Sequence, residues 1–305
     1  MEQQELSSRL PQGNGLVHGS GLVIGIDRSE APAVGDGAPS DRTERLSLVN
    51  DALSRQEAYW VERLAHLELI EIPYANRTAP PGAAPVYERL PGPVLPHLAS
   101  YVSALGGGWT GGDLLVAAFA LYLTRLAAKP RFDLSFGDLA LRREIGDLDG
   151  FFATHVPLLV DVDPEQGVDA ALAAVRAALV TARKRKTYVR DVVVRYPELS
   201  ALRGREIALP VPVCAVLDEC TEQYRPAPGS ELTLAVSPDG AFCHWIYAPH
   251  VFGAEDVAMM QQQFSVFVHG LIAESARALK HVPLLSPAER DRLLVEWNDT
   301  ATPYP

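Results

Sequence analysis

The chain is poor in sulfur-containing residues and has no long apolar run, and each shortage narrows the possible functions. Among its 305 residues are three cysteines, Cys214, Cys220 and Cys243, with no C-x-x-C pair, which is typical of a reduced cytosolic protein with buried thiols. A zinc site built on Cys214, Cys243 and His244 would lack the four ligands of structural zinc, so we expect no metal and no other cofactor. No apolar run approaches the roughly 18 residues that span a bilayer. The acidic, polar start MEQQELSSRL is unlike a secretory signal, and we predict a cytoplasmic protein.

Positive charge is also scarce. The chain has 27 Lys and Arg against 38 Asp and Glu, a formal net charge of -11. Such a balance argues against nucleic acid or an anionic membrane as a partner. Apolar residues make up 48% of the chain, which is enough for a substantial core in one large domain or two small ones.

The most informative stretch lies in the middle of the sequence. Apolar and polar residues alternate from Arg131 to Phe136, which predicts a strand. We expect a charged loop at Arg142-Arg143-Glu144 and then a second strand within Phe151–Val160. Pro157 has no amide hydrogen to donate to a neighbouring strand, so this second strand should lie at a sheet edge or turn that position outward.

Hydrophobic periodicity predicts an α/β fold in which a mixed β-sheet is packed with α-helices. Segments with helical periodicity should turn their apolar face inward, and Arg176 and Arg183 should face outward. Thr110 and Ser286 should each cap the start of a helix, and Pro287 should take the first helical position after Ser286. A turn at residues 238–240 should join two strands in a hairpin. The expected helices are 45–64, 93–105, 111–128, 168–185, 189–196 and 254–278, and the further strands are 86–90, 208–217, 231–237 and 241–247.

Two segments invite separate interpretations. Residues 1–43 are rich in Gly, Pro, Ser and Asp and are predicted to form a leader arm, partly disordered. The basic run Arg183-Lys184-Arg185-Lys186 is open to a phosphate- or carrier-binding role, but cations at the end of a helix also complement its dipole, and we favour that explanation.

Three motifs give the chain a resemblance to the second half of a nonribosomal peptide synthetase condensation domain. The first is a strand ending in Gly, a loop ending in Arg and a Gly-x-Phe…Pro-Leu segment, the second a Leu-x-x-Gln-x-x-Tyr-Trp-x-x-x-Leu helix before a Pro, and the third a linker that leads into an adenylation domain. The matching residues are Gly137, Arg143, Gly150, Phe152, Pro157 and Leu158; Leu53, Gln56, Tyr59, Trp60, Leu64 and Pro73; and Pro283–Ser286, Glu289, Arg290, Trp297, Asn298, Thr300, Tyr304 and Pro305. Thr154, His155 and Leu159 stand where the family has Asn, Thr and Arg.

The resemblance implies a single chloramphenicol-acetyltransferase-like lobe at residues 44–281, followed by a linker to an adenylation domain at 282–305. In the family, the catalytic His-His-x-x-x-Asp-Gly motif lies in the other lobe. None of the eight histidines here is adjacent to another, and none precedes an Asp-Gly pair at the required spacing. We therefore expect no catalytic residue and no independent catalysis. His155 is the one residue to consider, because the resemblance implies that it faces the region that lines the cleft in a complete domain. As a lone His it fits a hydrogen-bonded core or surface residue better than a base.

Two functional hypotheses follow. The preferred one is a non-catalytic interaction lobe at the front of a starter module, which buttresses the adenylation domain in cis, works beside a carrier protein domain and recruits a tailoring enzyme such as a β-hydroxylase. Its interface candidates are Thr154, His155, Leu293, Leu294 and Trp297. The alternative is half of a split condensation acyltransferase, completed by a catalytic lobe from another chain. A self-assembled acyltransferase fails on the missing histidines. Both live hypotheses imply exposed apolar surface, and hence a bound partner or a homo-oligomer.

Overall fold

The computed structural model describes residues 39–76, 86–93, 95–203, 209–273, 276–292 and 294. The chain divides into two compact units, residues 1–42 and 43–305, and of the first only residues 39–42 are described. The α-helices are α1 (Pro39–Ser54), α2 (Glu57–Ala65), α3 (Leu98–Leu105), α4 (Gly111–Leu126), α5 (Leu139–Ile145), α6 (Val168–Arg185), α7 (Val192–Arg195), α8 (Ala254–Ala273) and α9 (Pro287–Asp291). Three short 3₁₀ helices span Gly146–Leu148, Pro197–Leu202 and Leu279–His281.

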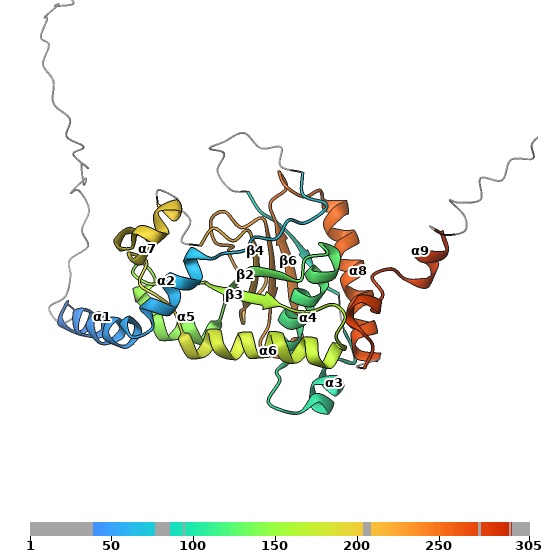
Figure 1. Cartoon of the computed structure of the whole chain (residues 1–305), viewed down its shortest axis with the longest axis horizontal. Coiled ribbons are helices and arrows are strands. Elements are labelled where there is room, and N and C mark those ends of the chain that lie inside the picture. The colour runs from blue at the N-terminus through green and yellow to red at the C-terminus, as the bar shows by residue number, and fades with distance from the viewer. Residues whose placement is uncertain are drawn as a thin grey trace, which may run out of the picture. The chain divides into compact units, whose positions relative to one another are not determined.

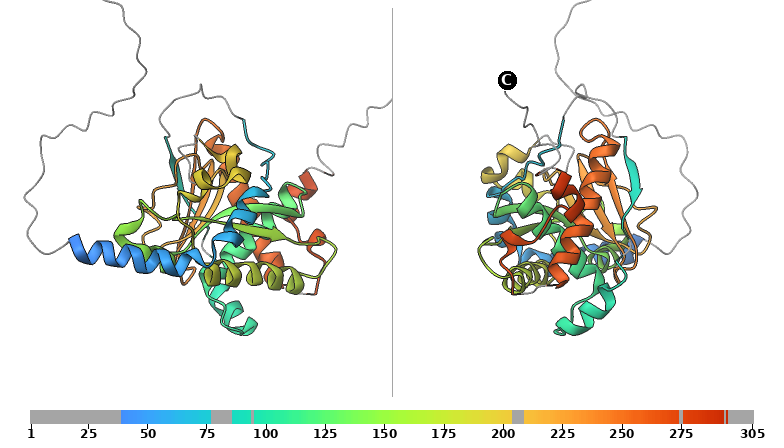
Figure 2. Two further views of the ribbon diagram at one scale, coloured as in Figure 1. Left: turned by 60° about the vertical axis from the view of Figure 1, so that its left-hand side comes forward. Right: turned by 90° about the vertical axis from the view of Figure 1, so that its right-hand side faces the viewer.

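The strands form one mixed sheet in the order β1-β6-β5-β4-β2-β3. They are β1 (Glu88–Pro91), β2 (Arg131–Gly137), β3 (Val156–Asp161), β4 (Val213–Leu217), β5 (Leu232–Val236) and β6 (Cys243–Tyr247). The pairs β2–β4 and β4–β5 are parallel, and the other three pairs are antiparallel. Strand β3 is an edge strand, as Pro157 predicted, and β1 lies at the opposite edge (Figures 1 and 2).

One face of the sheet is covered by helices. Helix α4 contacts β4, β5, α6 and α8, and α6 also contacts β3 (Figure 1). Helix α4 is apolar nearly all round, and its residues from Gly111 to Thr124 are buried, as expected for a helix enclosed on most sides. Aromatic rings join α4, α8 and β6: Trp245 lies 5.4 Å from Phe119 and 5.6 Å from Phe264 in edge-to-face geometry. Full burial of each such side chain contributes about 1.5–3 kcal/mol.

The other face of the sheet carries small and polar side chains. A row of paired residues across β2, β4 and β5 consists of Ser135, Cys214 and Thr233. A small apolar cluster of Val216, Ala235 and Ile246 completes this face, and Tyr224 from the β4–β5 connection covers it with Tyr87 beside it. Alternation in β2 therefore separates a face for the helical core from a face with polar groups.

Most predicted helices and strands are confirmed, with small differences in where they begin and end. Helices α4, α6 and α8 and strands β2, β3, β5 and β6 fall within the predicted ranges or extend them by one residue. The hairpin turn is confirmed: β5 and β6 pair antiparallel, and Gly240 has a φ of +77°, which suits glycine. The caps are confirmed too, since Thr110 accepts a hydrogen bond from the amide of Asp113, and Ser286 forms a capping box with Glu289.

Two local predictions are wrong. The helix expected at 45–64 begins at Pro39 and is interrupted at residues 55 and 56, so it forms α1 and α2. The expected charged loop at 142–144 is helical, because Asp138 caps α5 by accepting a hydrogen bond from the amide of Ala140 at 2.7 Å. Arg183 is exposed, as predicted, and its guanidinium also bonds to Asp113 and Asp138. The division into residues 1–43, 44–281 and 282–305 stays a prediction, although residues 39–43 lie within α1.

No helix in the described ranges has the length and apolar character needed to span a membrane.

Candidate functional site

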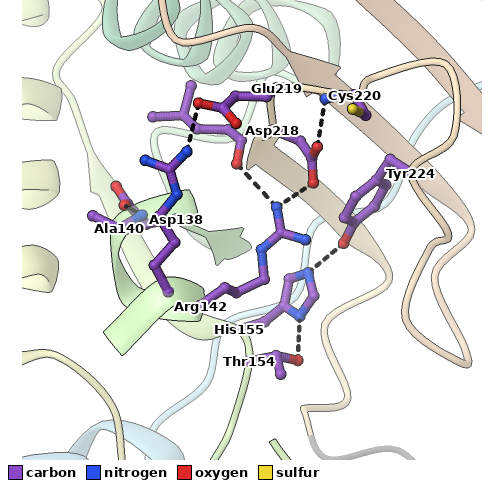
Figure 3. Close-up of polar contacts among 11 residues, drawn as sticks. Asp138, Ala140, Arg142, Thr154, His155, Asp218, Glu219, Cys220 and Tyr224 are labelled. Atoms are coloured by element: carbon purple, nitrogen blue, oxygen red, sulfur yellow. Dashed lines mark hydrogen bonds and ion pairs between the residues drawn. The ribbon is translucent and has the colours of Figure 1, made fainter. Parts of the chain in front are cut away.

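The candidate site lies at one end of the central strands. Because β2 and β4 are parallel, their carboxyl ends, Gly137 and Leu217, meet at the same end of the sheet. Strand β3 runs antiparallel to β2 and therefore starts there, directly after Thr154 and His155. Polar side chains from three separate segments of the chain thus converge on the polar face of the sheet (Figure 3).

His155 is held by hydroxyl groups on both sides. Its Nε2 lies 2.7 Å from the Tyr224 hydroxyl, and its Nδ1 lies 3.0 Å from the Oγ1 of Thr154 (Figure 3). A neutral imidazole has one donor and one acceptor nitrogen, and a hydroxyl can play either role. Both nitrogens are therefore satisfied in either tautomer, and the residue is only 8% exposed.

The surroundings keep this imidazole neutral. Burial, and then the positive charges of Arg142 and Arg190, lower the pKa of His155 to about 4. Burial likewise raises the pKa of the Tyr224 phenol well above its ordinary value, so the hydroxyl keeps its proton at neutral pH. A buried neutral histidine bonded at both nitrogens has no lone pair free to accept a proton from a substrate.

Glycine at position 137 makes room for the His155 ring. A Cβ atom placed on Gly137 would lie 3.0 Å from both Cδ2 and Nε2 of His155 and 3.3 Å from Val216. These contacts are tighter than ordinary van der Waals contact. The Gly that ends β2, one of the residues that carry the resemblance, is therefore needed here for close approach.

Helix α5 brings Arg142 into the site. Its guanidinium pairs with Asp218, donates to the Leu217 carbonyl at 3.2 Å and lies 5.4 Å from the centre of the Tyr224 ring (Figure 3). The Nε of Arg142 is buried and has no hydrogen-bond partner among the described residues. Arg142 thus links the end of β4 to α5 and retains one unsatisfied donor.

A cavity of about 330 Å³ opens beside His155. Its charged lining consists of three arginines, Arg142, Arg190 and Arg225, and one carboxylate, Asp149. The remaining lining is formed by Ser135, Thr154, His155, Leu209, Val211, Tyr224, Pro226, Ala227, Pro228 and Ser230. The lining therefore combines polar groups with apolar side chains from the segments before β4 and β5.

The described side chains do not form a metal site or an activated thiol. Among the described residues, no three His, Cys, Asp or Glu side chains are placed to hold a metal ion. Buried Cys214 lies 3.1 Å from the hydroxyl of Ser230, and burial raises the pKa of its thiol, which disfavours the nucleophilic thiolate. The chemical groups that the cavity lining offers are the guanidinium groups of arginines and the hydroxyl groups of Ser, Thr and Tyr.

The basic run at the end of α6 is largely used inside the fold. Arg183 donates to Asp113 at 2.5 Å and to Asp138 at 2.8 Å, and Lys186 pairs with Glu144. Because these are internal contacts, they do not favour the phosphate- or carrier-binding interpretation.

Arg185 in the same run is also engaged. It donates to Gln56 at 2.5 Å, its backbone carbonyl accepts from the indole of Trp60, and its guanidinium lies 4.6 Å from the ring centre of Tyr59. The Leu-x-x-Gln-x-x-Tyr-Trp motif therefore has a structural reason: its polar and aromatic side chains fasten α2 to the end of α6.

The structure brings together two of the five predicted interface residues. Thr154 and His155 both line the cavity. Leu294 lies elsewhere and is 58% exposed, while Leu293 and Trp297 fall outside the described residues. Sequence reasoning missed Tyr224, although the unusually long connection between the predicted strands ending at 217 and starting at 231 was a signal for a functional loop.

The chain is similar in sequence to parts of several peptide synthetases. No protein-family model matches the chain. Linear gramicidin synthase subunits D and B from Brevibacillus parabrevis are 25% and 26% identical over 283 and 290 residues, covering 86% of the chain but only 6% and 5% of those proteins. Malpibaldin synthetase from Mortierella alpina is 25% identical over 282 residues, again with 86% of the chain and 5% of the relative covered.

Solved structures show the fold. The starter condensation domain of rhizomide synthetase matches with a TM-score of 0.56 and 14% identity, over 80% of this chain and 58% of that one. The chain therefore has the fold of part of a condensation domain. The same fold occurs in the four-domain nonribosomal peptide synthetase AB3403 (TM-score 0.59, 14% identity, 86% of this chain and 22% of that one) and in the X-domain from teicoplanin biosynthesis (0.58, 18%, 84% and 64%). The condensation-like lobe thus spans a small part of the curated relatives that it matches.

Proposed function

We propose that this lobe is a non-catalytic interaction module of a nonribosomal peptide synthetase. It stands before the adenylation domain of a starter module, supports that domain through the segment after α8, and recruits a trans-acting tailoring enzyme such as a β-hydroxylase to the amino acid held on the carrier domain. The observation that carries the proposal is the state of His155, the histidine that lines the cavity at the end of the central strands.

His155 is unsuited to general-base catalysis for three reasons. Both of its nitrogens are engaged by hydroxyl groups, at 2.7 and 3.0 Å. Its pKa of about 4 lies well below the range that suits a base at neutral pH. The chain also has no His-His-x-x-x-Asp-Gly motif. A lobe that has the fold but neither the double-His motif nor a histidine suited to act as a base is consistent with a binding role.

The segment after α8 supports the proposed contact with an adenylation domain. Helix α9 has a capping box at Ser286, Pro287 in its first turn and a bond of 2.9 Å from Gln262 of α8 to Glu289. Helix α9 therefore has its own local start signal and a contact to the body of the lobe, which would orient whatever follows it.

The direct test is calorimetry of the full chain against each candidate tailoring enzyme encoded in the same gene cluster. We expect one of them to bind with a 1:1 stoichiometry per lobe. A chain carrying Lys184→Ala, on an exposed position of α6, serves as a matched control and should bind equally well. Absence of heat with every candidate would contradict recruitment and leave only the supporting role.

The alternative, half of a split condensation acyltransferase, rests on how much of a complete domain the chain covers. The lobe matches 58–64% of three isolated domains, two condensation domains and the X-domain, so a second lobe from another chain would complete a domain of the usual size. The assay is to mix the lobe with a chain that carries an intact double-His motif and with loaded carrier proteins. Peptide product that requires this lobe would favour the alternative, and no product would exclude it.

A further inference from the structure

The cavity beside His155 leads to an inference that is independent of partner recruitment. We infer that it is a binding site for a small organic acid, whose carboxylate lies between Arg190 and Arg225 and whose apolar body enters the cavity. Neither the resemblance nor the proposed function assigns a ligand to this place.

Uncompensated positive charge at the cavity is the first argument. The side chains of Arg190 and Arg225 line it, and neither makes a hydrogen bond or an ion pair with any described residue. Elsewhere in the lobe, arginines at the same sheet end do pair: Arg142 with Asp218, and Arg143 with Glu219 at 2.6 Å. The formal charge of the chain is -11, so carboxylates are abundant, yet among the described residues Asp149 is the one carboxylate in the lining.

The second argument is the neutral state of His155. The positive charges of Arg142 and Arg190 both lower its pKa, which means that their field reaches His155 in the cavity lining. A bound anion is stabilised by the same field, and planar guanidinium groups match the geometry of a carboxylate.

The volume and the lining of the cavity indicate what the ligand carries besides its carboxylate. A volume of about 330 Å³ falls at the lower end of the roughly 300–1,000 Å³ of small-molecule sites. An acidic side chain from a protein partner would fill only a fraction of it. Leu209, Val211 and the segment Pro226–Pro228 line the walls and suit an aliphatic or aromatic body, while Ser135 and Ser230 offer hydroxyl groups inside.

The test is ligand-observed NMR with the full chain, using hexanoate and 3-phenylpropionate as probes. Hexanamide and 3-phenylpropanamide are the matched neutral probes, and inorganic phosphate is a purely anionic one. We expect both acids to bind, and both amides to bind at least about tenfold more weakly, since loss of one charge-assisted pair changes affinity by such factors. Raising the salt concentration should weaken the acids and not the amides.

Variants localise the binding. The double substitution Arg190→Gln and Arg225→Gln should weaken both acids by about tenfold or more, and circular dichroism should show an unchanged fold because both side chains are exposed. Arg143→Gln, which removes an exposed arginine outside the cavity lining, should leave binding unchanged. Equal binding of acids and amides, binding of phosphate without the acids, or unchanged binding in the double variant would each overturn the inference.

Discussion

The two sides of the sheet differ in whether their arginine side chains are paired with carboxylates. On the helical side, Arg183 of α6 bonds to two nearly buried carboxylates, Asp113 and Asp138. On the polar side, Arg190 and Arg225 line a cavity without a bonded partner among the described residues. Paired buried charges hold helices α4, α5 and α6 together, whereas unpaired charges at a cavity indicate binding. The substitutions below test this difference, in order of decreasing expected effect.

Removing the cation on the helical side should have the largest effect. Arg183→Met leaves Asp113 and Asp138 without their partner while they remain 7% and 6% exposed. We expect a loss of about 3–5 kcal/mol in the free energy of unfolding, measured by urea denaturation. Lys184→Ala, one residue further along α6, should cost no more than about 0.5 kcal/mol. Equal, small losses in both variants would show that the network contributes nothing.

Acid should destabilise the polar side through His155. The folded pKa is about 4 and the ordinary value is 6.5, so between these values the unfolded chain binds a proton that the folded chain does not. This contribution to stability is complete above pH 6.5 and is lost as the pH falls towards 4, with a loss of about 2 kcal/mol at pH 5.

The measurement is urea denaturation at neutral pH and at pH 5 for the unmodified chain and for His155→Gln, which cannot titrate. Carboxylates titrate in both chains, so the difference between the two pH dependences reports His155. The groups that face it are the hydroxyls of Thr154 and Tyr224 and the charges of Arg142 and Arg190. Identical pH dependences would contradict the prediction.

Crowding the His155 ring should have a smaller effect. In Gly137→Ala the new methyl group lies 3.0 Å from the imidazole and should displace it from Tyr224, at a cost of about 1.5 kcal/mol. Gly150→Ala is the matched control, because nothing lies within 4 Å of its Cβ position. Thermal unfolding of both variants distinguishes the two sites, and a Gly137→Ala protein as stable as the control would refute the close approach.

The smallest expected effect concerns the start of α4. Thr110→Ala removes the oxygen that accepts from the amide of Asp113 at 3.1 Å and should cost about 1 kcal/mol. Thr110→Ser keeps the hydroxyl and should recover most of the loss. Urea denaturation of the two variants makes the comparison, and equal stability would mean that the Asp113–Arg183 pair alone fixes this helix end.

Local patterns in the sequence predicted the fold well. Alternation identified β2, Pro157 identified β3 as an edge strand, and Gly240 identified the hairpin turn, because each depends on nearby residues. The break between α1 and α2 and the helical state of residues 142–144 escaped prediction. The break involves a tertiary contact, since Gln56 bonds to Arg185, 129 residues away. Helix α5 had a local start signal, the cap at Asp138, which the loop prediction overlooked.

The candidate site was predictable only in part, because residues far apart in the sequence form it. Thr154 and His155 stood out because they depart from the family pattern. Tyr224, Arg190 and Arg225 come from segments whose positions in sequence carry no sign that they share a cavity. Only the parallel pairing of β2 with β4 and the path of the β4–β5 connection bring them together.

The central claim is that the histidine at the end of the central strands is a neutral structural residue and not a base. Nitrogen-15 NMR of the full chain, with His155 assigned by comparison with His155→Gln, measures this directly. We predict that the His155 ring keeps the chemical shifts of a neutral imidazole from neutral pH down to about pH 5 and titrates with a pKa of about 4. A ring that titrates at 6.5 or above would contradict the claim.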